Sequence, residues 1–311
     1  MHHRITTIDT GYMGPRRAAA FLIQDGDRAA FVEANTALAV PRLLATLDAA
    51  GLAPEQVDLV AVTHVHLDHA GGAAALLAAC PNATLLAHPR AARHLIDPSR
   101  LVASAIAVYG AEPFAALYGT IKPVDPARVR AMEDGATASL GASTLTFVHT
   151  RGHANHHAVI HDDRAAAVFT GDAFGLAYPD LQTGGRFVFP STSPTDFDPD
   201  AAHRSVDRIL ALAPERVFLT HYGEYHDLET MAHALHRQLD AYATLLADAA
   251  SPSLPDLDID ALTTDRVAAI FDAELRAHDL DSPETRALLD VDITLNAQGV
   301  AFVARRLRAT P

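Results

Sequence analysis

The sequence predicts an α/β protein built from layers of sheet and helix, and three observations support this prediction. Over residues 5–87, β-type and helix-type runs alternate along the chain. After a helical stretch, a second series of β-type runs occupies residues 139–219. Side chains of the kinds that bind metal ions follow directly after several of these runs. We therefore expect a core of sheets with a functional site at the ends of its strands.

The first third of the chain supplies strands that alternate with helices. Two β-type runs flank Asp25-Gly26-Asp27, a sequence typical of a hairpin turn. Pro41 stands where a helix can begin and Gly51 where it can end. The expected strands are 5–9, 19–23, 29–32, 57–63 and 84–87, and the expected helices are 41–50 and 73–79.

Residues 89–126 are too many for an ordinary connection between strands, and their pattern is typical of helices. We predict that this segment is a helical insertion that lies over the site. Strands and one helix then follow. The expected helices are 89–96, 101–109, 113–118 and 198–212, and the expected strands are 139–140, 144–148, 158–160, 166–169 and 216–219.

The last third of the chain is predicted to be helical, with no strand after His221. Apolar residues from Leu228 to Leu246 repeat at helical spacing, and a last helix is expected from Pro283 towards Arg306. His233 and His236 lack a third ligand nearby in the sequence, so we expect both to be solvated. The predicted domains are residues 1–226, which include the insertion, and a helical extension over 227–311.

Composition narrows the classes of partner. The net charge of −14 argues against a generic nucleic-acid or anionic-membrane surface. The single Cys80 excludes an intramolecular disulfide and a zinc site built from cysteines, which fits a reducing compartment. The N-terminus has no apolar signal core, and no run of 18 apolar residues occurs. We expect a cytoplasmic protein with a small-molecule partner, no nucleic acid and no membrane; the insertion and the C-terminal helices are the candidate surfaces for a homodimer.

The hexapeptide His64-Val65-His66-Leu67-Asp68-His69 holds four metal-ligand side chains directly after the expected strand 57–63. On an extended backbone, His64 and His66 project the same way, so both imidazoles can share one ion. Asp68 and His69 follow one turn later and are aimed at a neighbouring position. This arrangement predicts a metal site.

Three more candidate ligands follow later strands: His153, Asp172 and His221. With the hexapeptide they supply five histidines and two aspartates, enough for two divalent ions with positions left for water. Imidazole and carboxylate ligands without thiolate favour Zn²⁺, with iron or manganese as alternatives. We therefore predict two divalent metal ions per chain, zinc being the favoured ion.

These motifs resemble those of the metallo-β-lactamase superfamily, specifically its binuclear hydrolases related to hydroxyacylglutathione hydrolase (glyoxalase II). The matching blocks are the hexapeptide, Gly152-His153, Gly171-Asp172 and Thr220-His221, and the resemblance covers roughly residues 5–226. It implies an αββα sandwich of two mixed sheets with the metals at one edge. The related dioxygen-reducing diiron branch carries a carboxylate where His66 stands, which argues against a redox role here.

The resemblance also implies how the ligands are divided. His64, His66 and His153 would hold the first ion, whereas Asp68, His69 and His221 would hold the second, and Asp172 would bridge the two. A water between two such ions has its pKa lowered from ~15.7 towards ~7, which provides a bridging hydroxide at neutral pH. Asp68 is the expected catalytic residue, because it would orient that hydroxide as well as bind metal.

The predicted activity is hydrolysis of a carboxylic ester, thioester or lactone. The alternatives are a phosphodiesterase on the same two ions and a metal-loaded ligand-binding effector with little turnover. The sequence lacks a P-loop, a dinucleotide fingerprint and a serine nucleophile elbow. The absence of an obvious basic patch in the insertion argues against glutathione thioesters.

Three residues are candidates for binding substrate: Arg151, Tyr109 and Tyr222. Arg151 stands where the family usually has proline, so it either anchors a carboxylate or phosphate of the substrate or pairs with a local acid. His156 and His157 are expected to lie outside the metal ligands. Aromatic side chains gather near the expected site loops and indicate either an apolar substrate pocket or local packing: Tyr109, Phe114, Tyr118, Phe174, Tyr178, Phe187 and Phe189.

Overall fold

The computed structural model describes residues 3–192 and 195–309, and for residues 108 and 109 it describes the backbone but not the side chains. The side chain of Tyr109, a predicted substrate residue, therefore lies outside the described residues. The chain divides into two compact units. The first consists of Met1–His149, His156–Gly171 and Leu212–His226, and the second of Thr150–Asn155, Asp172–Ala211 and Asp227–Pro311. The predicted domain boundary after residue 226 remains a prediction.

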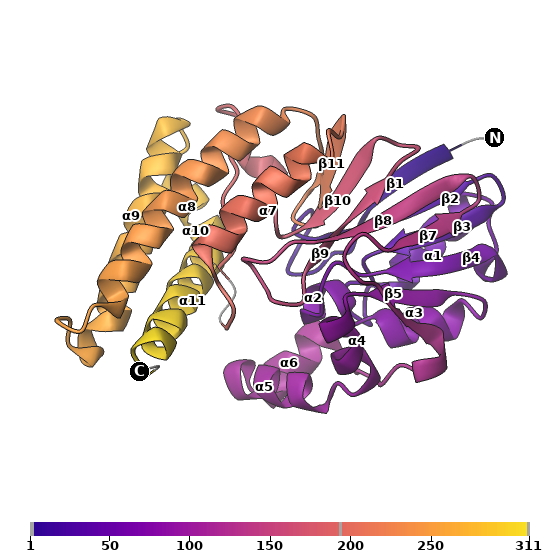
Figure 1. Cartoon of the computed structure of the whole chain (residues 1–311), viewed down its shortest axis with the longest axis horizontal. Coiled ribbons are helices and arrows are strands. Elements are labelled where there is room, and N and C mark those ends of the chain that lie inside the picture. The colour runs from indigo at the N-terminus through magenta and orange to yellow at the C-terminus, as the bar shows by residue number, and fades with distance from the viewer. Residues whose placement is uncertain (1–2, 193–194, 310–311) are drawn as a thin grey trace. The chain divides into compact units, whose positions relative to one another are not determined.

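The first unit contains two six-stranded sheets, and its first sheet has its strands in chain order (Figure 1). Antiparallel pairing joins the first three strands, and parallel pairing joins the third to the sixth. The strands are β1 (His3–Asp9), β2 (Ala19–Asp25), β3 (Arg28–Val32), β4 (Val57–Ala61), β5 (Thr84–Ala87) and β6 (Val129–Ala131).

The second sheet has the order β12-β11-β10-β9-β8-β7, and β10 and β11 are its parallel pair. Its strands are β7 (Thr137–Leu140), β8 (Ser143–His149), β9 (Ala158–Asp162), β10 (Ala167–Gly171), β11 (Arg216–Leu219) and β12 (Gly223–Tyr225). The prediction that strands end at His221 is wrong, because β12 folds back on β11. The periodicity did not reveal β12 or β6, since each has only three residues.

The two sheets of the first unit pack face to face around a core of aliphatic and aromatic side chains. The rings of Phe21, Phe169 and Phe218 lie at its centre, with centroids 5.1–5.3 Å apart. Helices α1 (Val40–Ala49), α3 (Ala73–Ala79) and α4 (Pro89–Ile96) pack on the first sheet through a second cluster that includes Leu43, Leu76 and Leu85. The described residues also form four short 3-10 helices: Pro54–Gln56, Pro126–Arg128, Pro179–Leu181 and Asp256–Asp258.

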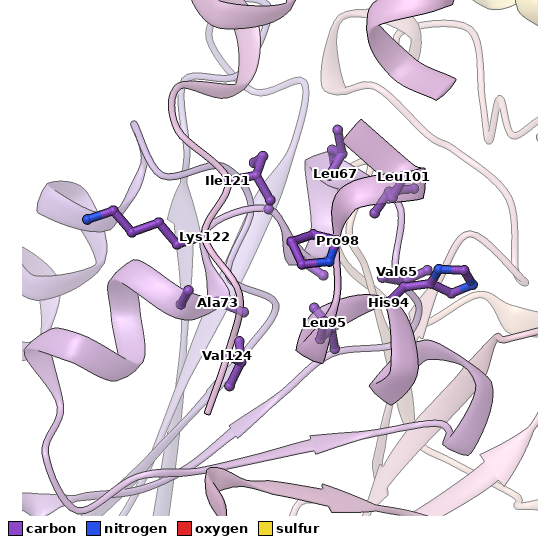
Figure 2. A pocket seen from close by; sticks show the side chains of 13 residues that line it. Val65, Leu67, Ala73, His94, Leu95, Pro98, Leu101, Ile121, Lys122 and Val124 are labelled. Atoms are coloured by element: carbon purple, nitrogen blue, oxygen red, sulfur yellow. The ribbon is translucent and has the colours of Figure 1, made fainter. Parts of the chain in front are cut away.

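The insertion forms helices, as the sequence predicted: α4, α5 (Ser99–Tyr109) and α6 (Ala111–Tyr118). Phe114 and Tyr118 are buried against Leu67 of the short helix α2 (Leu67–Ala70). Figure 2 shows the small pocket that remains between α4, α5 and residues 121–124, with the Lys122 side chain pointing away from it. Its free space of about 10 Å³ is no more than one water molecule needs. These two aromatic rings therefore pack the insertion rather than line a substrate pocket.

The second unit is helical, and Figure 1 shows its long helices alongside one another. The helices of this unit are α7 (Pro199–Ala211), α8 (Leu228–Ala250), α9 (Ile259–Ala277), the short α10 (Pro283–Leu288) and α11 (Asp290–Ala309). The last predicted helix is thus two helices, which meet at the buried Leu289. Phe174, Phe187 and Phe189 are fully buried in this unit, so they too pack its core.

The described residues contain no single helix with the length and apolar character of a membrane span. The segments Ser99–Ala107 and Ala111–Tyr118 meet that criterion only as a pair, and they are bent by 120° relative to each other.

His88 caps helix α4 in a way that makes stability depend on pH. Its Nδ1 accepts a hydrogen bond from the Arg90 backbone N–H at 3.0 Å, so this nitrogen must be unprotonated. Burial, reinforced by His149, His156 and Arg90, lowers the pKa of His88 from 6.5 to about 4. Between these two values the unfolded chain binds a proton that the folded chain does not.

We expect the free energy of unfolding to fall as the pH is lowered from 6.5 towards 4, because His88 takes up a proton in the unfolded chain but not in the folded chain. His88→Asn keeps a capping acceptor but cannot titrate, so it should flatten the pH dependence in this window by up to one proton. Urea unfolding at a series of pH values measures the slope. His233→Asn, on an exposed part of α8, is the control; an unchanged slope in His88→Asn would contradict the assignment.

Candidate metal centre

The hexapeptide 64–69 follows β4 and brings its histidines together. His64 Nε2 and His66 Nδ1 lie 2.8 Å apart, and their rings meet edge to face. His64 is fully buried and His66 is half-buried. The two nitrogens thus converge on one position, which is the geometry that the i, i+2 spacing indicates for a shared ion.

A second group of ligand atoms gathers beside the first, from Asp68, His69 and His221. These atoms all lie within 4.8 Å of one another. Asp68 Oδ2 is 3.8 Å from His69 Nε2 and 3.4 Å from His221 Nε2. Ligands at about 2.0–2.2 Å from a common ion are separated by distances of this order, so the three donors fit one divalent ion.

Glu33, directly after β3, holds this half of the centre together, although no pattern in the sequence singles it out. Its carboxylate accepts hydrogen bonds from Thr63 Oγ1 at 2.5 Å, His69 Nδ1 at 3.0 Å and Thr220 Oγ1 at 3.1 Å. It is fully buried, with a φ of +65° that a glutamate rarely adopts. A carboxylate behind a histidine fixes the tautomer that leaves Nε2 to bind metal.

Two further histidines, His221 and His64, are oriented by the same principle. His221 Nδ1 lies 2.7 Å from the Arg17 carbonyl oxygen, and His64 Nδ1 lies 3.1 Å from Thr63 Oγ1. Each ring therefore has one nitrogen engaged by an oxygen and presents the other to its neighbouring ligands. This pattern of supported imidazoles is typical of metal sites.

Tyr222 follows His221 and is half-buried against the core between the sheets. Burial raises the pKa of its hydroxyl, and the Asp9 carboxylate adds to the effect while Arg16 opposes it. The phenol therefore stays protonated at neutral pH. Its role towards a substrate remains a prediction.

His157 and His156 lie next to the histidines of the hexapeptide in the first unit. His157 is fully buried, with its ring centroid 4.8 Å from that of His64. The His156 ring lies 5.5 Å from that of His66. Both histidines thus adjoin the histidines of the first group.

Gly171, which precedes Asp172, has a φ of +50° and leaves no room for a side chain. A Cβ there would lie 2.5 Å from Thr63 Oγ1 and 2.6 Å from His157 Nε2. Gly51 has a similar φ of +74°, but nothing lies within 4 Å of its Cβ position. Alanine at Gly51 would therefore meet only the cost of the left-handed backbone, whereas alanine at Gly171 would also meet a steric conflict.

Gly51→Ala should lower the free energy of unfolding by about 1–2 kcal/mol, the cost of the left-handed conformation. Gly171→Ala should cost about 1–3 kcal/mol more, because the packed groups around it must move. Urea denaturation of the two variants measures the difference. Equal losses would show that the contacts of Gly171 do not constrain the chain.

The second unit holds the two other predicted ligands side by side. His153 Nε2 lies 3.3 Å from Asp172 Oδ2, and His153 Nδ1 lies 3.0 Å from the Ser191 carbonyl oxygen. The segment that carries Ser191 is fixed by Asn296 of α11, whose side chain binds the backbone of Thr192 at 2.7 Å and of Pro190 at 3.0 Å. His153 therefore has the same kind of support as the histidines of the first unit.

A small pocket in the second unit adjoins these two ligands and is lined by Arg151. Arg151 is exposed, and its Nε donates a hydrogen bond to Asn155 Oδ1 at 2.9 Å. Ser205 Oγ donates to the Arg151 carbonyl oxygen at 2.5 Å, which fixes the backbone beside His153. The remaining lining is largely apolar and includes Phe197 and Leu235. The pocket has free space of about 20 Å³, no more than one or two water molecules need.

Comparison with known proteins identifies the family. The sequence profile of the metallo-beta-lactamase superfamily matches residues 13–221. A metallo-beta-lactamase fold-containing protein of Sulfurisphaera tokodaii is 29% identical over 173 residues, which are 54% of this chain and 62% of that protein. A probable metallo-hydrolase of Burkholderia pseudomallei is 35% identical over 102 residues, 30% of this chain and 32% of that protein. The chain thus spans about three fifths of the length of the first relative and about one third of the length of the second.

Solved structures show the same fold over nearly the whole chain. An archaeal metallo-beta-lactamase superfamily protein from Sulfolobus tokodaii gives a TM-score of 0.66 at 21% identity, covering 96% of this chain and 99% of that one. A metallo-beta-lactamase family protein from Thermus thermophilus gives 0.65 at 17% identity, covering 97% and 93%. The chain belongs to the metallo-beta-lactamase superfamily, and its fold has the predicted pair of sheets and helical C-terminal extension.

Proposed function

We propose that the chain is a binuclear metallohydrolase that cleaves a carboxylic ester, thioester or lactone. The observation that supports this most directly is the donor set Asp68, His69 and His221, with oxygens holding the outer nitrogens of both histidines. Such a set of imidazole and carboxylate donors suits a divalent ion that polarises the carbonyl oxygen of an acyl group. The match to the family model places the chain in this superfamily, and the choice of acyl substrate is our proposal.

The family resemblance assigns seven ligands, which we adopt as part of the proposal. His64, His66 and His153 would hold one ion, Asp68, His69 and His221 the other, and Asp172 would bridge them. Two such ions, when bound, would acidify a water molecule and polarise the carbonyl oxygen of the substrate. Zinc is the favoured ion for these imidazole and carboxylate donors.

The chain's own residues would do the rest of the chemistry. The Asp68 side chain is 23% exposed, so its carboxylate can reach solvent and orient an attacking water. Arg151, which is exposed beside His153 and Asp172, would bind an anionic group of the substrate. Tyr222, with its hydroxyl protonated, would donate a hydrogen bond to a substrate oxygen.

Two measurements test the proposal. Metal analysis of the purified full chain should find close to two ions per chain, and none at all would contradict it. A panel of p-nitrophenyl esters, thioesters, lactones and bis-p-nitrophenyl phosphate should then show turnover of one acyl class. Turnover of the phosphodiester alone would favour phosphoryl transfer, and no turnover by the metal-loaded protein would favour a ligand-binding effector.

A further inference from the structure

The short helix α2 carries Asp68 and His69, and it depends on hydrogen bonds from outside itself. A helix leaves the carbonyl groups of its last four residues without partners within the helix. Since α2 has only four residues, this applies to most of its length. The carbonyl groups of Asp68 and His69 must therefore find donors in another segment.

The segment 33–36, directly after β3, supplies these donors. The backbone N–H groups of Ala34 and Asn35 both donate to the His69 carbonyl oxygen at 2.9 Å. The side-chain Nδ2 of Asn35 donates to the Asp68 carbonyl oxygen at 2.7 Å. Asn35 is fully buried, so its hydrogen bonds are shielded from solvent.

Asn35 takes over both ends of a hydrogen bond that a continuous helix would contain. In such a helix the Asp68 carbonyl oxygen would accept from the N–H of Gly72, four residues later. Here the Nδ2 of Asn35 donates to that oxygen, and the Asn35 carbonyl oxygen accepts from Gly72 N–H at 2.7 Å. A Cβ on Gly72 would lie 2.5 Å from the Ala34 carbonyl oxygen, so only glycine permits this approach. Asn35 thus interrupts the helix directly after α2 and holds the backbone of Asp68.

The backbone of Asn35 does not itself require an asparagine. Its φ of +49° lies in the left-handed region, which glycine adopts more easily. Its Oδ1 is buried without a hydrogen-bond partner among the residues that the structure describes, and a buried unpaired acceptor lowers stability. The feature that a glycine would lack is the donor to Asp68.

We propose that Asn35 is a positioning residue, which holds the carboxylate of Asp68 between His69 and His221 by fixing the Asp68 backbone. This inference rests on the proposed function of Asp68 in metal binding and hydrolysis. Asp68 Oδ2 lies 3.8 Å from His69 Nε2 and 3.4 Å from His221 Nε2, and the Asp68 side chain is partly exposed. The hydrogen bond from Asn35 constrains the buried end from which this carboxylate extends.

The substitution Asn35→Gly removes the amide and keeps a residue that adopts the left-handed backbone. At saturating metal, kcat on the best acyl substrate should fall by about 10–100-fold while KM stays within about twofold, because a misplaced catalytic group slows the reaction rather than binding. Asn82→Gly is the matched control. Asn82 Nδ2 also donates to a backbone carbonyl at 2.7 Å, that of Glu55, but in the exposed turn before β5, so its kcat should be unchanged.

A double substitution separates positioning from a general loss of structure. If Asn35 acts through Asp68, adding Asn35→Gly to Asp68→Asn should lower kcat by less than about threefold further, because the group that Asn35 positions is already gone. A further loss as large as in the unaltered protein would show that Asn35 supports the fold in general, and it would overturn the proposal.

Co²⁺ binding by the full chain tests the same contact without turnover. Chelator competition should show that Asn35→Gly binds Co²⁺ about 10–100-fold more weakly, as expected for a group that orients a ligand. The visible absorption spectrum of the Co²⁺-loaded variant should also change, whereas that of Asn82→Gly should match the unaltered protein. Unchanged affinity and spectrum in Asn35→Gly would overturn the proposal.

The two readouts distinguish this inference from the proposed hydrolysis. If the unaltered protein turns over no acyl substrate, the proposed hydrolysis is wrong, and the Co²⁺ comparison alone decides whether Asn35 positions Asp68. Asn35→Asp keeps the size of the side chain but replaces the donor by a carboxylate that only accepts. It should therefore reproduce the loss of affinity, and it tests the proposal even if the glycine variant fails to fold.

Discussion

Replacing Glu33 by glutamine should both destabilise the protein and weaken metal binding. The carboxylate accepts hydrogen bonds from Thr63, His69 and Thr220. The NH₂ group of glutamine is itself a donor, so it cannot accept these hydrogen bonds. The free energy of unfolding should fall by about 2–5 kcal/mol, because charged hydrogen bonds are lost in a buried place. Affinity for the ion at His69 should fall by about 10–100-fold.

Urea unfolding of the metal-free chain and chelator competition of the loaded chain separate the two effects. Glu112→Gln, on an exposed residue of α6, is the control and should stay within about 0.5 kcal/mol. A Glu33→Gln variant that is less stable but binds metal normally would mean that Glu33 holds the strand ends and does not orient His69.

Replacing Asp68 by asparagine should have the largest effect on turnover. The substitution keeps the size of the side chain but removes the negative charge between His69 and His221. We expect kcat on the best substrate to fall by about 10²–10⁴-fold, the contribution of a positioned group that handles a proton. The loss should persist when the metal concentration is raised to saturation, because Asp68 is proposed to orient water as well as bind the ion.

Asp48→Asn, on the exposed face of α1, is the matched control and should leave kcat unchanged. Metal content and kcat are measured on the same samples. Full recovery of turnover by excess metal would show that Asp68 serves only as a ligand. Unchanged turnover of Asp68→Asn without added metal would show that Asp68 has no role in the active site.

Local sequence patterns predicted most of the elements, because their signals lie within each segment. Helix 73–79 and strands 84–87 and 216–219 have the predicted bounds, since apolar residues and turn residues define them locally. Strands β6 and β12 were missed, because a three-residue strand is stabilised by its partner rather than by its own residues. The break at Leu289 was missed for a related reason, as a buried leucine fits a continuous helix equally well.

In the candidate site, too, the sequence reveals residues that lie in one segment but not residues that only folding brings together. His64, His66, Asp68 and His69 are visible together because one strand end presents all four. Their supporting groups are not visible in this way. Glu33 is separated from Thr220 by 187 residues, and an isolated glutamate after a strand matches no ligand pattern. His236, which we expected to be solvated, contacts His203, and their Nδ1 atoms lie 2.6 Å apart. This contact forms only when α7 and α8 pack, so neither sequence segment indicates it alone.

The contact between α11 and the segment 190–192 extends the constraints on the metal centre to the far end of the chain. Asn296 fixes the backbone whose Ser191 carbonyl holds His153. A truncation ahead of α11 would keep all seven proposed ligands and still remove the amide that fixes the segment whose Ser191 carbonyl oxygen engages His153 Nδ1. Substitutions in α11 should therefore alter metal affinity although no ligand is changed. Distance along the chain does not predict which substitutions the metal centre tolerates.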